Sequence, residues 1–358
     1  MAAFHPITVS DIRQETSESV SIGLAVPEDL AERFDFLPGQ YLTLRTEIGG
    51  EDVRRCYSIC SGLDDGEIRI GVKRVEGGTF SVHANQALKA GDVLDVLPPQ
   101  GRFIAQIEPD RAKTYLAVAA GSGITPILSI AKSVLSGEPG SRFTLIYANR
   151  RAASVMFAEA LEDLKDRFME RFRVVHVLSR EQRDVALFSG RIDAEKIKSF
   201  CSNVVDASEL DHVFLCGPPP MTAEASAALQ AIGVDGARIH IERFSLDGMA
   251  PPQGRQLAEP GGRPKTAEVE AVLDGTRHRF AMRADDPNVI DAAARNGLVL
   301  PHSCKGGMCC TCRCLIVEGK GEMAVNYSLE PWELEEGFTL ACQTTPTSKK
   351  LVLDFDAV

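Results

Sequence analysis

The first part of the chain alternates short apolar runs with turn residues. These runs are rich in β-branched and aromatic residues, and they are 5–12, 19–26, 40–46, 55–60 and 67–75. Many short strands at such spacing are typical of an all-β barrel or sandwich. One helical pattern, FSVHANQALKA at 80–90, interrupts the series. We expect an antiparallel β-barrel domain over residues 1–108.

A different rhythm begins near residue 112, where apolar strand runs alternate with amphipathic helical runs. The expected strands are 113–120, 142–150, 172–181, 212–221 and 237–244, and the expected helices are 127–135, 157–168, 194–201 and 222–233. Strands that alternate with helices predict a parallel, doubly wound α/β sheet. We assign this domain to residues 109–245.

The last part of the chain begins after a stretch rich in Pro, Gly and polar residues, 246–266, which has the composition of an interdomain linker. Strand patterns follow at 267–273, 276–283, 313–319 and 351–356, with a helical pattern at 288–297 that ends at a glycine. The sequence therefore predicts a third domain over residues 267–358.

The overall composition narrows the possible partners and compartments. The 358 residues carry a net charge of −11, which argues against a nucleic-acid partner. The chain start lacks the basic and apolar regions of a secretory signal, and no apolar run approaches the roughly 18 residues that span a bilayer. We expect a cytoplasmic protein without a membrane partner, in which clustered thiols stay reduced and bind metal.

Five of the ten cysteines lie in the segment CKGGMCCTCRC at 304–314. Cys304, Cys309 and Cys312, followed by the distant Cys342, match the plant-type [2Fe–2S] spacing C-x4-C-x2-C…C. The Gly-Gly pair inside the loop permits tight backbone and lets amide N–H groups point at the cluster sulfurs. These four cysteines are the predicted iron ligands.

The alternatives to a cluster are a zinc site or a set of buried structural thiols. Zinc sites usually pair two short C-x2-C units, and this segment has one. No triplet that includes Cys310 or Cys314 gives the required spacing, so we expect both to be bystanders. Cys56, Cys60 and Cys201 lack ligand spacing and are by default small buried apolar residues.

Two segments of the predicted barrel have the chemistry to bind a flavin nucleotide. Arg55, Tyr57 and Ser58 end a strand, where an arginine grips a pyrophosphate, an aromatic flanks the ring and a hydroxyl bonds its edge. The turn GGTFS at 77–81 opens the helical segment, and such a turn suits an anion. The alternatives are a surface Arg-Tyr pair and a capped helix without a ligand.

The predicted α/β domain carries nucleotide signals at the carboxyl ends of its strands. AAGSGITP at 119–126 follows a strand and opens a helix, as a phosphate-binding loop does. Arg150, Arg151 and the SRE segment at 179–181 are suited to an adenosine 2′-phosphate, which favours NADP over NAD. CGPPPM at 216–221 ends the fourth strand at the same crevice. Solvated arginines and a structural Cys216 are the alternatives.

The order of these three segments resembles the ferredoxin–NADP⁺ reductase superfamily followed by a β-grasp ferredoxin. The motifs that carry the resemblance are RCYS, GGTFS, GSGITP and CGPPPM. The chain resembles most closely the reductase subunits of phenylacetyl-CoA epoxidases, in the stretches RRCYSIC, FTLIYANR, SGRID, IHIERF, LPHSCKGGMCCTCRC, NYSLEP and VLDFDA.

This resemblance implies an oxidoreductase that passes electrons from NADPH through FAD and the cluster to a di-iron oxygenase of phenylacetate catabolism. It implies that Cys216 and Ser58 act at the reacting rings. The cofactor-binding residues that it implies are Arg55, Cys56, Tyr57, Ser58, Val72, Lys73, Gly78, Thr79, Phe80, Ser81, Gly121, Ser122, Gly123, Thr125, Pro126, Arg150, Arg151, Ser179, Arg180, Cys216, Gly217, Pro218, Met221 and Phe244.

Three alternatives and two departures accompany this assignment. The acceptor is alternatively another multicomponent oxygenase or a hybrid-cluster protein, and a non-redox scaffold with degenerate sites is a more remote alternative. Plant reductases end in the aromatic that covers the flavin, whereas this chain continues past Phe244. Cys310 is a thiol that the ferredoxin pattern does not require.

Residues 267–358 have a net charge of −5. Their glutamates at 330–336 form either a solvated helix face or a docking patch for a basic acceptor.

Overall fold

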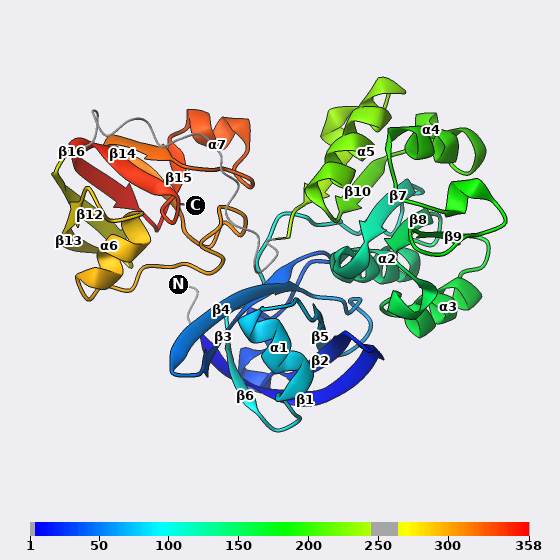
Figure 1. Ribbon diagram of the computed structural model, residues 1–358, viewed down its shortest axis with the longest axis horizontal. Coiled ribbons are helices and arrows are strands. Elements are labelled where there is room, and N and C mark those ends of the chain that lie inside the picture. The colour runs from blue at the N-terminus through cyan, green and yellow to red at the C-terminus, as the bar shows by residue number, and fades with distance from the viewer. Residues whose placement is uncertain (1–3, 245–263, 358) are drawn as a thin grey trace. The chain divides into compact units, whose positions relative to one another are not determined.

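The computed structural model describes residues 4–244 and 264–357. It forms two compact units, the first built from residues 4–53 and 57–244 and the second containing 264–357. The predicted linker at 246–266 lies almost entirely outside the described residues. Each unit is described by itself below (Figure 1).

The amino-terminal half of the first unit is a six-stranded sheet with the order β4-β3-β6-β1-β2-β5. Its strands are β1 His5–Thr16, β2 Ser19–Ala25, β3 Tyr41–Ile48, β4 Glu51–Ser58, β5 Ile68–Lys73 and β6 Val93–Val96. Strand β1 runs antiparallel to β2 and β6, and a bridge between Ile59 and Ile70 brings the two ends of the sheet together. The predicted antiparallel barrel is confirmed.

Alternation along the strands explains why this segment closes into a barrel. Ile7 and Val9 of β1 are buried, whereas Pro6 and Thr8, which alternate with them, are exposed. Successive side chains of a strand point to opposite faces, so the apolar set shares one interior. Helix α1, Thr79–Gln86, contributes the fully buried Phe80 to that core.

The second half of the first unit is a parallel sheet with the order β11-β10-β7-β8-β9. Its strands are β7 Thr114–Ala120, β8 Arg142–Asn149, β9 Phe172–Leu178, β10 His212–Cys216 and β11 Ile239–Glu242. Its helices are α2 Ile124–Gly137, α3 Ala158–Arg167, α4 Ala194–Asn203 and α5 Pro219–Ala231. The two faces form separate apolar cores, with α2 and α3 on one and α4 and α5 on the other. The predicted doubly wound sheet is confirmed, and its switch point lies between β7 and β10.

The second unit is a mixed five-stranded sheet with the order β13-β12-β16-β14-β15. Its elements are β12 Thr266–Leu273, β13 Thr276–Arg283, α6 Val289–Arg295, β14 Arg313–Met323, α7 Pro331–Glu335, β15 Phe338–Leu340 and β16 Thr344–Asp354. Strands β12 and β16 pair in parallel, and the apolar face of α6 packs on the same core as the sheet. This arrangement is the predicted β-grasp ferredoxin fold.

The pattern of the sequence missed two short strands, β6 and β15. They have four and three residues, which is too short for a period of hydrophobicity to appear. Helix α7 lies in the acidic segment at 330–336, for which a helix face is one of the two interpretations. Within the described residues, no helix is long and apolar enough to cross a membrane.

Candidate functional site

The nucleotide-binding loop and the end of strand β10 meet at the switch point of the parallel sheet. A Cβ atom on Gly123 would lie 2.3 Å from the carbonyl oxygen of Cys216 and 3.1 Å from its Sγ. A side chain at position 123 would therefore displace β10, and glycine is the residue that fits. The structure brings together two motifs, GSGITP and CGPPPM, which begin at residues 121 and 216, 95 positions apart in the sequence.

The loop at the start of α2 has the properties of an anion site. A 3-10 turn, Gly121–Gly123, leads directly into the helix, and the N–H of Ile124 bonds the carbonyl oxygens of Gly121 and Ser122. The helix has no side-chain cap at its amino end, and such an end attracts an anion. Gly121 has a φ of 56°, and the hydroxyl of Tyr147 donates a 2.9 Å hydrogen bond to its carbonyl oxygen. Nearby on β8, the buried side chain of Asn149 interacts with the phenol of Tyr147. A Cβ atom on Gly121 would meet nothing within 4 Å, so the space over the loop is open and fits a nucleotide phosphate.

The barrel reaches this loop through strand β5. A Cβ atom on Gly71 would lie 2.6 Å from the methyl carbon of Thr125 and 2.9 Å from the ring of Phe157. Glycine at 71 therefore allows the barrel strand to pass directly against the first turn of α2. The predicted flavin segment ends one strand away, with Ser58 buried at the end of β4.

Glu242 is a residue of this site that the sequence reasoning missed. It pairs in register with Cys216 across β10 and β11. Its Oε2 atom is buried and has no hydrogen-bond partner among the described residues, although the residue as a whole is partly exposed. Burial raises the pKa of Glu242 to about 8, and a hydrogen bond from Ser58 partly opposes that shift. Glu242 therefore carries a proton at neutral pH.

Cys216 lies next to Glu242 and is fully buried. Burial raises the pKa of its thiol, and the neighbouring Glu242 raises it further. The thiol is therefore neutral across the physiological range. Ser58, Cys216 and Glu242, which come from the barrel and from two strands of the parallel sheet, form one group of neutral polar side chains.

Helix α1 of the barrel offers a second anion site. Its N-cap is Gly78, which makes no side-chain capping bond, so an anion can accept from the first N–H groups of the helix. The rings of Tyr57 and Phe80 have centroids 5.2 Å apart, and Phe80 is fully buried. Ser81 accepts a hydrogen bond from the N–H of Val75 through its hydroxyl, which fixes the turn that leads into the helix. A turn of this kind beside β4 fits the pyrophosphate of FAD.

Two cations from different domains gather beside these loops. Lys73 ends β5 and Arg150 follows β8. Burial lowers the pKa of Lys73, Glu18 opposes this shift, and the charge of Arg150 lowers the pKa further. Lys73 is half-buried and Arg150 is exposed. Two like charges that are close enough to interact are an arrangement that an anionic ligand stabilises.

The predicted 2′-phosphate residues lie together at the carboxyl ends of β8 and β9. The N–H of Ser179 donates to the carbonyl of Asn149 and the N–H of Arg180 donates to that of Arg150, at 2.9 and 2.8 Å. The side chains of Arg150, Arg151, Ser179 and Arg180 are all exposed. Glu181 accepts a hydrogen bond from the N–H of Ala152, which holds the two strand ends together.

The remaining predicted cofactor residues differ in accessibility. Arg55 and Cys56 are half-buried on β4, Gly217 and Phe244 are half-buried, and Thr79 and Pro218 are exposed. Val72, Pro126 and Met221 are buried, and Val72 belongs to the barrel core. The side chain of Val72 packs inside the barrel, so any contact of Val72 with a cofactor involves its backbone.

The four predicted cluster ligands converge as two pairs in the second unit. The thiols of Cys304 and Cys309 lie within hydrogen-bonding reach of each other, and so do those of Cys312 and Cys342. Within the described residues, no three His, Cys, Asp or Glu side chains surround one point as a single metal ion would require. Each iron of a [2Fe–2S] cluster takes two thiolates, so two pairs fit the cluster.

The backbone of the ligand loop directs N–H groups at these sulfurs. The N–H of Gly306 lies 3.3 Å from Sγ of Cys304, and the N–H of Cys304 lies 3.5 Å from Sγ of Cys309. Gly307 has a φ of 75°, and a Cβ there would lie 3.1 Å from the carbonyl oxygen of Val325. N–H groups aimed at the sulfurs stabilise negative charge on a cluster.

The two other thiols of the segment differ from the four. Cys314 is fully buried in β14, and burial raises its pKa, so it stays a neutral thiol in the core. Cys310 packs against the same core and has a φ of 51°, a left-handed conformation that few non-glycine residues adopt. The spacing of the cysteines contained no sign of this backbone conformation.

Comparisons with known families match each of the three domains. Residues 6–104 match the oxidoreductase FAD-binding domain, residues 117–227 the oxidoreductase NAD-binding domain, and residues 271–347 the 2Fe-2S iron-sulfur cluster binding domain. Each match falls inside one of the three predicted segments. A chain with these three families is an oxidoreductase with sites for FAD, a nicotinamide nucleotide and a [2Fe–2S] cluster.

Relatives along the full length share this order of domains. The chain is 43% identical over 357 residues to one subunit of the 1,2-phenylacetyl-CoA epoxidase from Escherichia coli K12, in a match that covers 100% of this chain and 99% of that one. It is 35% identical to the ferredoxin reductase component of 3-ketosteroid-9-alpha-monooxygenase from Rhodococcus rhodochrous, over 98% of this chain and 96% of that one.

Two solved structures share the fold. Phthalate dioxygenase reductase aligns with a TM-score of 0.59 at 22% identity, over 98% of both chains. An intact type IV self-sufficient cytochrome P450 monooxygenase aligns with a TM-score of 0.68 at 23% identity, over 98% of this chain and 41% of that one. Taken together, the three matched domains and the full-length relatives show that the chain belongs to the family of flavin- and [2Fe–2S]-containing reductase components of multicomponent oxygenases.

Proposed function

We propose that this chain delivers electrons from NADPH, through FAD and a [2Fe–2S] cluster, to a di-iron oxygenase that epoxidises phenylacetyl-CoA. The observation that carries the proposal is the 43% identity to a subunit of 1,2-phenylacetyl-CoA epoxidase, over the whole of both chains. The reductase component of 3-ketosteroid-9-alpha-monooxygenase is 35% identical over a similar length, so the steroid oxygenase is the second candidate acceptor.

FAD, when bound, would take the hydride of NADPH, and the [2Fe–2S] cluster would pass on its two electrons one at a time. The chain's own contribution is to bind and orient them. In our proposal, Arg55, Tyr57 and the turn at 78–81 hold FAD. Ser58 bonds the ring edge, and Cys216 and Thr125 face the nicotinamide. The neutral Ser58, Cys216 and Glu242 leave no net charge beside the reacting rings.

We propose NADPH rather than NADH as the donor. Arg150, Arg151, Ser179 and Arg180 lie together at the carboxyl ends of β8 and β9, where the adenosine ribose binds in sheets of this kind. A planar guanidinium suits a phosphate, whereas a free 2′-hydroxyl needs no positive charge.

We also propose domain boundaries at 1–108, 109–245 and 267–358, and a cytoplasmic location. Within the described residues no disulfide joins two cysteines, which suits a reducing compartment.

We further propose that the acidic segment at 330–336 is a docking surface for a basic acceptor. One glutamate fewer than the sequence suggested contributes its charge to this surface. Glu333 is fully buried and pairs with Arg313 at 2.6 Å, so the charges that face solvent come from the other glutamates.

The test combines the full-length holoprotein with purified oxygenases. NADPH oxidation that depends on phenylacetyl-CoA, and the yield of its epoxide, are measured with the epoxidase core and compared with steroid hydroxylation by the 3-ketosteroid oxygenase. We expect turnover with the epoxidase core and at least tenfold less with the steroid oxygenase. Reduction of ferricyanide by the same preparation shows that the reductase is active. An active reductase that does not support epoxidation would refute the assigned acceptor.

A further inference from the structure

A short loop of the barrel is fastened to helix α2 at three successive points. The loop, residues 60–67, connects the barrel strands β4 and β5 and is here called the clamp loop. Ser129 of α2 donates a 2.6 Å hydrogen bond to the carbonyl oxygen of Ser61, and both residues are buried. The hydroxyl of Ser133 accepts a 3.1 Å hydrogen bond from the N–H of Leu63.

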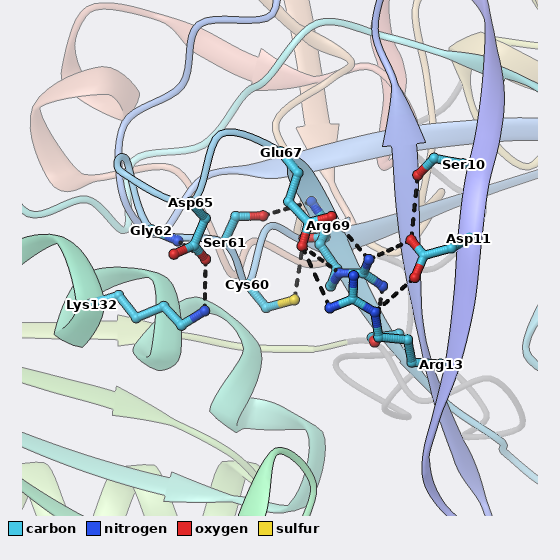
Figure 2. A network of polar contacts seen from close by, with 11 residues as sticks. Ser10, Asp11, Arg13, Cys60, Ser61, Gly62, Asp65, Glu67, Arg69 and Lys132 are labelled. Carbon is cyan, nitrogen blue, oxygen red and sulfur yellow. Dashed lines mark hydrogen bonds and ion pairs between the residues drawn. The ribbon is translucent and has the colours of Figure 1, made fainter. Parts of the chain in front are cut away.

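The third contact is an ion pair at the rim of the same surface. Lys132 contacts Asp65 at 2.6 Å, and the same carboxylate oxygen accepts a 3.0 Å bond from the N–H of Gly62 (Figure 2). A Cβ atom on Gly62 would lie 2.7 Å from Cβ of Lys132. The backbone of the clamp loop therefore lies directly against the helix, with no space for a side chain between them.

The three helix residues share one face, because positions i, i+3 and i+4 are neighbours on an α-helix. Most of α2 is apolar and buried, so serines on the face toward the barrel are unusual. An apolar surface alone is non-directional, whereas these hydrogen bonds allow one register. Ser133 uses its own proton on the carbonyl of Ser129, which leaves its oxygen to accept from Leu63.

The base of the clamp loop is fixed to the barrel by a second set of bonds. The N–H of Arg69 donates to Ser61 Oγ at 2.7 Å, and the buried guanidinium of Arg69 bonds Asp11 and Glu67 (Figure 2). The loop is therefore a rigid connection between the barrel and α2.

The clamp loop connects the predicted flavin-binding strand to the start of α2, where the nicotinamide is proposed to bind, by a short path along the chain. Ser61 lies three positions after Ser58, which ends the predicted flavin strand. Ser129 lies four positions, about one helical turn, after Thr125 at the start of α2. A slide of α2 along its axis would move the nicotinamide loop relative to the flavin strand, and these bonds prevent it.

We propose that the clamp loop and the Ser129–Ser133 face of α2 set the distance and angle between nicotinamide and flavin, which makes Ser129 and Ser133 positioning residues for hydride transfer. In that step the C4–H bond of the dihydronicotinamide breaks with its electron pair and an N5–H bond of the flavin forms. NADPH is oxidised to NADP⁺ as the flavin gains two electrons. A displacement of about 1 Å at such a site can slow the reaction about 100-fold. The proposal concerns only flavin reduction and holds for any oxygenase acceptor.

The test uses the full-length holoprotein with Ser129→Ala and Ser133→Ala. Anaerobic stopped-flow mixing with NADPH measures the rate constant of flavin reduction, its isotope effect with 4-deuterated NADPH, and the nucleotide Kd. We expect a 10- to 100-fold slower reduction with Kd changed less than threefold. The long-wavelength absorbance of the stacked nicotinamide and flavin should weaken, and the N–H of Leu63 should exchange faster with solvent in Ser133→Ala.

The matched control is Ser202→Ala on α4. Ser202 makes the same kind of bond to a preceding helix carbonyl, that of Lys198, on an exposed helix surface. The flavin of Ser202→Ala should be reduced by NADPH at the wild-type rate. Gly62→Ala tests the clamp without removing any hydrogen-bonding group. Its added methyl group pushes the loop from α2, so this variant should slow flavin reduction at least tenfold.

Reduction within twofold of wild type in folded, FAD-loaded Ser133→Ala and Gly62→Ala would overturn the proposal, as would an equal slowing in Ser202→Ala. If Ser129→Ala does not fold, the flavin-reduction rates of Ser133→Ala and Gly62→Ala decide the question. Flavin reduction needs no oxygenase, so a failure here is distinct from a failure of the assigned acceptor.

Discussion

The hydroxyl of Tyr147 donates a 2.9 Å hydrogen bond to the carbonyl oxygen of Gly121, and so joins the interior of strand β8 to the nucleotide loop. Tyr147 is fully buried, and burial raises the pKa of its phenol, which remains a neutral donor. The bond holds Gly121 in its left-handed conformation, with a φ of 56°.

Replacement of Tyr147 by Phe should therefore weaken NADPH binding without loss of FAD. A hydrogen bond contributes about 1 kcal/mol, so the Kd for NADPH should rise about fivefold. The measurement is a nucleotide titration that follows flavin absorbance. Tyr115→Phe is the control, because its hydroxyl bonds Glu138, away from the nucleotide loop. An equal loss of affinity in both variants would contradict the role given to Tyr147.

The repulsion between the like charges of Lys73 and Arg150 predicts a pH dependence of nucleotide binding. Burial lowers the pKa of Lys73 and Arg150 lowers it further, so this lysine loses its charge at a lower pH than a free lysine does. A bound phosphate favours the charged form, so binding at alkaline pH should take up a proton and weaken as pH rises.

Lys73→Met should bind NADP⁺ about tenfold more weakly at pH 7, as expected for loss of a charged hydrogen bond of about 1.5 kcal/mol. Its affinity should also change less between pH 8 and 10 than that of the wild type. Calorimetric titrations in two buffers of different ionisation enthalpy report the proton uptake. A variant with the same alkaline loss as wild type would show that another group titrates.

The difference between Cys309 and Glu242 shows what the sequence could and could not predict. The four cluster ligands follow from a spacing, because three of them lie in one loop whose length the iron geometry fixes. Glu242 has no such signal, since it lies beside Cys216 only through the register of β10 with β11, and beside Ser58 only through the packing of the barrel on the sheet. A glutamate in the last predicted strand of the parallel sheet, two residues before Phe244, is the one hint that the sequence contained.

The same limit applies to Gly71 and Gly62, which the sequence reasoning did not select. Their importance comes from the close approach of Thr125 and Lys132, residues more than 50 positions away. Long strands and helices were found because their periodic patterns are local. Contacts between domains and the left-handed backbone of Cys310 depend on packing that no local pattern encodes.

The proposed preference for NADPH, argued from Arg150, Arg151, Ser179 and Arg180, can be tested at Arg180. Arg180→Ala should lower kcat/KM for NADPH by about 10- to 100-fold, the effect of about 1.5–3 kcal/mol for a charged hydrogen bond. The value for NADH should stay within about twofold, because NADH lacks the 2′-phosphate. Arg173→Ala is the control, since its guanidinium bonds the carbonyl of Val204 and leaves the strand end intact. Equal losses with both donors would argue against 2′-phosphate recognition by Arg180.

The raised pKa of Glu242 predicts a pH dependence of stability. The folded protein holds a proton on this carboxyl up to about pH 8, whereas the unfolded chain releases it near the ordinary value of 4.5. The stability that this difference contributes is complete below pH 4.5 and is lost as pH rises through about 8.

Glu242→Gln should therefore lose less thermal stability than the wild type between pH 5 and pH 9. The side chain is partly exposed, so we expect a difference of about 1–2 kcal/mol, or roughly 5 °C in Tm, for FAD-loaded protein. Ser58→Ala removes the bond that lowers the pKa of Glu242 and should move the pH window upward. Parallel pH profiles for wild type and Glu242→Gln would show that Glu242 does not titrate in this range.

The five clustered thiols should separate into ligands and bystanders when each is replaced. Cys309→Ala should abolish the [2Fe–2S] absorbance and the reduced-state EPR signal, because one iron loses half of its thiolate pair. It should keep NADPH-dependent reduction of ferricyanide, which takes electrons from the flavin directly.

Cys310→Ala and Cys314→Ala should retain the cluster signals. Cys314 is fully buried, so its loss should still destabilise the protein by about 1–2 kcal/mol through the space it leaves. Cys310→Gly should be at least as stable as Cys310→Ala, because glycine adopts a φ of 51° without strain. If Cys310→Ala lost the cluster while Cys309→Ala retained it, the two neighbours would exchange roles, and the C-x4-C-x2-C spacing would not describe the iron ligands of this chain.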